Sequence, residues 1–130
     1  MRTVKLLVLT VLAGGMAGLG VYAASDADKP KHAIDSVMDI AHKPKKGTPS
    51  LFKRVVDGKA SKEEQKQLLS LYEDLSKNKP PKGSAQDWKD RTSKMIAAAR
   101  DVVDGKQGAT RVLGKVVNCK ACHELHKGDD

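Results

Sequence analysis

Both cysteines of the chain lie in one short stretch near its C-terminus, residues 118–123, with the sequence Asn-Cys-Lys-Ala-Cys-His. C-x-x-C-H is the spacing at which a c-type haem is attached. On a helix, positions i, i+3 and i+4 share one face. Cys119 and Cys122 could therefore form thioethers to the two vinyl groups of one porphyrin, while His123 offers an imidazole nitrogen to the iron as proximal ligand. The motif predicts one covalently bound haem c.

Two other chemistries use similar residues. C-x-x-C also serves as a thiol–disulfide redox motif, usually at the start of a helix that follows a strand. Here the pattern places the motif near the end of a helical segment, with no strand pattern before it. Zinc could be bound by Cys119, Cys122, His123 and His126, but structural zinc sites normally take their ligands from two separated pairs. These four residues lie close together on one predicted helix, so we favour haem attachment over zinc.

The N-terminal residues have the pattern of an export signal. Arg2 and Lys5 are followed by an uncharged, largely apolar run, and 21–23 has the small-x-Ala form of a signal-peptidase site. We expect residues 1–23 to be a cleaved signal peptide and residues 24–130 to form a periplasmic haem domain. The alternative is an uncleaved anchor that contacts the membrane, since the apolar run approaches the ~20 residues needed to span a bilayer.

The chain is basic, with 24 Lys and Arg against 16 Asp and Glu and a net charge of +8. Lysines are scattered through two predicted loops, and aromatic residues make up 3% of the sequence. Nucleic-acid binding is therefore a poor interpretation, because no aromatic platform accompanies the charge. We expect a solvated basic surface, which could steer the protein toward an acidic redox partner protein.

Apolar residues recur at helical spacing after the leader, and no convincing run of period-two alternation occurs. Proline and glycine breaks divide the chain into five predicted helices, 30–42, 50–57, 61–77, 84–104 and 109–127. A capping box is predicted at Ser61, an N-cap at Ser84, and an inward-facing Val112 on the last helix. The predicted fold is all-α, an antiparallel four-helix bundle with one short extra helix around a covalently bound haem.

An exported all-α chain with one C-x-x-C-H close to its C-terminus resembles the class II c-type cytochromes, the cytochrome c-prime family. That family is a four-helix antiparallel bundle with its haem on the last helix, whereas the class I fold carries the motif near its N-terminus. The family usually has an aromatic residue and then an arginine three and four residues after the ligand histidine. Here His126 and Lys127 hold those positions, and we expect both at a solvated helix end.

The resemblance also bears on the distal side of the haem. Low-spin family members have a methionine on the first helix that ligates the iron opposite the proximal histidine, and Met38 is the matching position. The alternative is that Met38 fills the core, as methionines on apolar stripes usually do. His42, one turn further along the same face, is the runner-up ligand, although its place beside a basic loop predicts a solvent-facing ring. Met95 and His32 are weaker candidates.

The expected function is that of a monohaem c-type cytochrome that carries single electrons and is not an enzyme. The alternative is a five-coordinate cytochrome that binds nitric oxide or carbon monoxide, as high-spin members of the family do. A peroxidase-like haem would need a distal acid–base pair, and His42 has no apparent partner for one. The family resemblance also implies a possible homodimer, formed through the first two helices.

Overall fold

The protein is described here by a computed structural model that places residues 28–129, so the predicted signal peptide, 1–23, lies outside the described residues. The described part is all-α, as predicted, with no strand beyond one isolated bridge between Lys45 and Thr48. None of its helices is long and apolar enough to cross a membrane. Its helices are α1 (Ile34–Ala41), α2 (Leu51–Val56), α3 (Lys62–Lys77), α4 (Ala85–Val103), α5 (Ala109–Val116) and α6 (Cys119–His126).

Local capping sets where the long helices begin. The Ser61 hydroxyl accepts a hydrogen bond from the Glu64 N–H, and the Glu64 carboxylate accepts one from the Ser61 N–H, so the predicted capping box is confirmed. Ser84 caps α4 through the Asp87 N–H, as predicted. These bonds satisfy amide groups that have no partner inside the helix.

The prediction of one continuous last helix is wrong. The helix breaks at Val117 and Asn118, whose ψ angles of 90° and 89° are not helical. The Asn118 side chain accepts a hydrogen bond from the Ala121 N–H at 3.1 Å and so starts a new helix. The C-x-x-C-H motif therefore begins a helix instead of ending one, which is also the usual place of a thiol–disulfide motif. Within the described residues, however, no strand precedes it.

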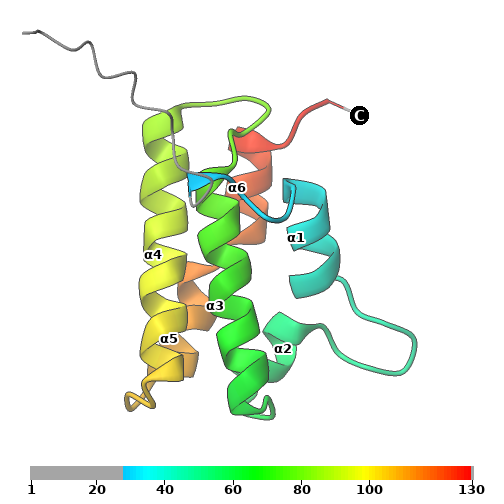
Figure 1. Ribbon diagram of the computed structural model, residues 1–130, viewed down its shortest axis with the longest axis vertical. Coiled ribbons are helices and arrows are strands. Elements are labelled where there is room, and N and C mark those ends of the chain that lie inside the picture. Colours follow the sequence, from blue (N-terminus) through cyan, green and yellow to red (C-terminus); the bar gives the residue numbers. More distant parts are fainter. Residues whose placement is uncertain (1–27, 130) are drawn as a thin grey trace, which may run out of the picture.

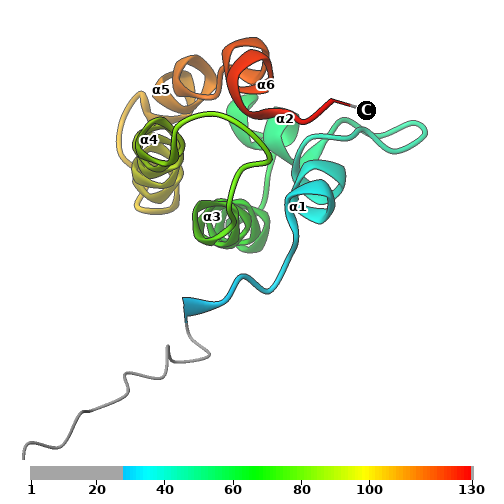
Figure 2. The same ribbon diagram turned by 90° about the horizontal axis from the view of Figure 1, so that it is seen from above.

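When the molecule is viewed along the length of its helices, α1, α3, α4, α5 and α6 lie around a common centre (Figure 2). α3 and α4 run side by side in opposite directions, and α5 returns along α4 (Figure 1). α1 packs against α3 and α2, and α2 also contacts α5. In contrast, α6 has no extended close backbone contact with any other helix of the described residues. α6 is thus held mainly through its side chains.

The buried apolar core comes from α1 to α5 and leaves α6 at its margin. Its members are Val37, Ala41, Leu51, Val55, Leu68, Leu71, Tyr72, Leu75, Trp88, Met95, Ala98, Ala99, Val102, Ala109 and Leu113. α5 packs through Ala109 and Leu113, which are four residues apart on one face. The prediction that Val112 faces inward is wrong, since the side chain is 50% exposed on the neighbouring face.

Candidate functional site

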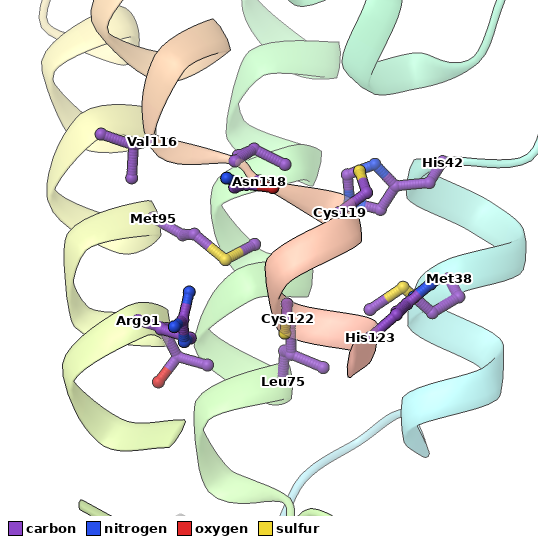
Figure 3. A pocket seen from close by; sticks show the side chains of 12 residues that line it. Met38, His42, Leu75, Arg91, Met95, Val116, Asn118, Cys119, Cys122 and His123 are labelled. Carbon is purple, nitrogen blue, oxygen red and sulfur yellow. The ribbon is translucent and has the colours of Figure 1, made fainter. Parts of the chain in front are cut away.

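A pocket lies between α1, α3, α4 and the junction of α5 with α6, and encloses about 580 Å³ of empty space including its open mouth. The predicted haem-attachment residues, the proximal histidine and the two leading distal candidates all line this pocket: Cys119, Cys122, His123, Met38 and His42. Figure 3 shows the first two on α1 and the other three on α6, with Met95 and Arg91 on the α4 side. Residues more than 75 positions apart in the chain therefore meet at one site.

The α6 wall carries the motif in the order that helical geometry dictates. Cys119, Cys122 and His123 occupy positions i, i+3 and i+4 of a helix that starts at Cys119. Cys119 and His123 are exposed at the mouth, and Cys122 is partly buried and packs against the core. Across the pocket, the partly buried Met38 projects from α1 toward α6 (Figure 3). A thioether sulfur and an imidazole thus face the same space from two helices.

A second hollow adjoins the first and shares Met38, Cys122 and His123 with it. It holds about 880 Å³ including open solvent and reaches Trp88 and His126. The Trp88 indole nitrogen is buried and, within the described residues, has no hydrogen-bond partner. An unpaired buried donor is costly. The two hollows adjoin at the α6 motif, and apolar side chains form most of their walls.

The expectation that His42 faces solvent is wrong. Its Nε2 lies 3.3 Å from the Tyr72 hydroxyl, and its ring stacks on Tyr72 and lies 5.1 Å from the Phe52 ring centroid. Burial, and then the positive charge of His123, lowers the pKa of His42 from 6.5 to about 4. His42 is therefore a neutral imidazole at neutral pH. Tyr72 and Phe52, which cover the ring, come from other helices. The lysine-rich sequence that follows His42 therefore does not indicate that His42 is buried.

The two thiols are free and are not joined in a disulfide. Burial raises the pKa of the Cys122 thiol, which keeps it protonated at neutral pH. Burial, and then the electrostatic interaction with Cys119, raises the pKa of Tyr72. A protonated Cys122 is a poor nucleophile at neutral pH.

The structure does not assemble the zinc site that the sequence left open. Among the described residues, no group of three or more His, Cys, Asp or Glu side chains gathers to hold a metal ion. The ring of His126 instead binds Asp87 and the Lys82 carbonyl. The expectation that His126 is solvated is therefore wrong, because the residue is 2% exposed. Lys127 is exposed, as predicted.

The pocket also contains residues that sequence reasoning missed or ranked low. Met95 lines it from α4, one turn beyond Arg91, which is partly buried, and Thr92, which is buried. Arg91 could have been found from its i, i+4 spacing to Asp87, with which it forms a 2.6 Å ion pair. His32 lies elsewhere and binds Asp74 at 2.7 Å.

The donor set of the pocket suits a covalent haem: two thiols and an imidazole on one helix, a sulfur ligand opposite, and apolar walls between them. Comparison of the chain with protein-family models, with curated proteins and with solved structures finds no match. The residues of the pocket and their geometry are therefore the basis for assigning a function.

Proposed function

We propose that the protein is an exported monohaem c-type cytochrome, similar to the cytochrome c-prime family, that carries single electrons. One observation carries this proposal: the C-x-x-C-H residues of α6 and Met38 of α1 line the same apolar pocket. When bound, the haem supplies an iron that exchanges one electron between its ferric and ferrous states. In this proposal α1, α3, α4 and the broken last helix, α5 with α6, form the four-helix bundle, and α2 is the extra helix.

The residues of α6 would hold the group in place. Cys119 and Cys122 would each form a thioether, which fixes the haem to the first turn of the helix. His123 would serve as proximal ligand from the next position on the same face. The apolar walls, among them Leu75, Met95 and Val116, would exclude water and so help to set the reduction potential.

Met38 is the better candidate than His42 for the distal position. The His42 Nε2 already meets the Tyr72 hydroxyl, which is buried. If His42 turned toward the iron, this hydroxyl would lose its partner, at a cost of about 1–3 kcal/mol. Met38 has no such bond to break, and its unbranched side chain adapts readily. Methionine ligation raises the potential relative to a second histidine.

Covalent attachment is tested on purified protein by acid–organic extraction followed by intact-mass measurement. The mass should equal a chain that begins at Ala24 plus one haem, and the Cys119→Ala, Cys122→Ala double variant should retain none. Haem that extracts from the wild type, with a bare polypeptide mass left behind, refutes the proposal. A mass that still includes Met1 would instead support the membrane anchor.

The distal ligand is tested by visible spectroscopy. Ferric protein with methionine ligation should show a weak band near ~700 nm. Met38→Ala should remove the band and open the site to carbon monoxide, whereas His42→Ala should keep it. Met95→Ala is the matched control, because Met95 lines the same pocket from a different helix. A high-spin wild type would favour the gas-binding candidate over the electron carrier.

A further inference from the structure

The far end of α6 is fastened to the start of α4 by one buried side chain, His126. Its Nδ1 lies 3.0 Å from the Lys82 carbonyl oxygen and its Nε2 lies 2.7 Å from Asp87 Oδ2. The ring also meets Trp88 edge-on, with 5.2 Å between the ring centroids. Both nitrogens and one edge of the ring are therefore occupied.

The partners of His126 determine which atoms carry hydrogen. A backbone carbonyl can only accept a hydrogen bond, and so can an ionised carboxylate. Asp87 is ionised, because hydrogen bonds from Arg91 and then from His126 lower the pKa of Asp87. Each ring nitrogen of His126 thus lies beside an oxygen that accepts, the Lys82 carbonyl for Nδ1 and Asp87 Oδ2 for Nε2, so both contacts are hydrogen bonds when both nitrogens donate.

The backbone next to Lys82 fits closely against the same histidine. Gly83 has a φ of +86°, and a Cβ at this position would lie 2.5 Å from the Leu125 carbonyl oxygen and 2.7 Å from His126 Nδ1. The turn before α4 therefore lies directly on the last turn of α6, at a distance that only glycine permits.

These contacts matter because α6 is otherwise loosely attached. It has no extended close backbone contact with another described helix, so side-chain contacts decide its position. His126 follows His123 by three residues, which puts both on adjacent turns of one face. Asp87 Oδ2 also accepts a 2.6 Å hydrogen bond from Arg91 Nε, and Arg91 lines the pocket. The contacts of His126 thus lead back to the pocket wall.

We propose that His126 is a positioning residue whose two N–H donors clamp α6 to Lys82 and Asp87 and so fix the direction in which His123 faces the pocket. The clamp itself does not depend on haem; its effect on an iron ligand rests on the function proposed above. An aromatic residue at this position could fill the space but could not form either hydrogen bond.

The first test measures the ring nitrogens of His126 by ¹⁵N NMR in the purified, reduced wild-type protein at neutral pH. Both nitrogens should show attached hydrogen. A bare nitrogen on His126 overturns the clamp. This result does not depend on whether the protein holds haem, so the clamp and the proposed function can fail separately.

The second test compares His126→Phe with His32→Phe. His32 is the matched control, because it also binds a carboxylate, Asp74, at 2.7 Å, but lies on the N-terminal segment against α3 and is 39% exposed. His126→Phe should keep its covalent haem but lose most of the ~700 nm band. Its amides at 122–126 should exchange about ten- to hundredfold faster. His32→Phe should change neither. Equal effects of the two variants on the band, or no effect of His126→Phe, overturn the proposal.

Two substitutions of Asp87 separate positioning from general stability. Asp87→Asn keeps an oxygen that accepts from His126 Nε2. This variant should therefore retain the ~700 nm band, and its amides at 122–126 should exchange as slowly as those of the wild type. Asp87→Ala removes the acceptor and should behave like His126→Phe. These variants also decide the question if His126→Phe fails to fold. Asn and Ala variants that match each other in both measurements refute the clamp.

Discussion

Gly83→Ala offers a quantitative test of how closely α6 lies against the turn before α4. The new Cβ would stand 2.5 Å from the Leu125 carbonyl oxygen, which belongs to backbone and cannot rotate away. Either the turn or the end of α6 must shift. A shift breaks the hydrogen bond between His126 Nδ1 and the Lys82 carbonyl, which measures 3.0 Å.

The size of the effect follows from a matched glycine. Gly58 also has a positive φ, +71°, but a Cβ there would meet nothing within 4 Å. Gly58→Ala should therefore cost only the left-handed backbone strain, about 1–2 kcal/mol. Gly83→Ala also loses the hydrogen bond between His126 Nδ1 and the Lys82 carbonyl, which costs about 1.5–3 kcal/mol more for a charged donor. Since both substitutions restrict the unfolded chain equally, this effect cancels in the comparison.

Urea unfolding followed by far-ultraviolet circular dichroism measures both variants and the wild type under the same conditions. Gly83→Ala should lower the free energy of unfolding by about 2.5–5 kcal/mol in total, against about 1–2 kcal/mol for Gly58→Ala. Two variants that differ by less than about 0.5 kcal/mol would refute the close approach of Gly83 to α6.

Three further predictions concern the rest of the fold. In urea unfolding, Leu113→Ala should cost about 2–5 kcal/mol, and the adjacent Val112→Ala less than about 0.5 kcal/mol, because only the first is buried. Ser61→Ala should cost about 1 kcal/mol by removing the capping box, and an unchanged midpoint would contradict this. In the haem-free chain, the lowered pKa of His42 means that its contribution to stability is present above pH 6.5 and is lost as pH falls toward 4; unfolding at several pH values should show a loss of at most about 3 kcal/mol that His42→Phe removes.

Residues with neighbours close in sequence could be predicted from the sequence alone. The capping box at Ser61 and the N-cap at Ser84 use bonds between residues three positions apart, so the sequence contains both partners. The relative placement of Cys119, Cys122 and His123 also follows from helical periodicity. The break before the motif had a local cause as well, the Asn118 cap, but apolar periodicity continued through it and favoured one long helix.

The burial of the two pocket-side histidines was decided by tertiary structure. His42 stands beside lysines in the sequence, yet Tyr72, thirty residues away, and Phe52 cover its ring. His126 stands near the chain end, yet Asp87 and the Lys82 carbonyl, about forty residues away, bind both of its nitrogens. Periodicity reports which face of a helix is apolar, and it says nothing about a polar ring whose partners come from another helix. The packing of α1 on α3 and of α6 on α4 supplies those partners, because a buried polar group is stable only where its hydrogen bonds are satisfied.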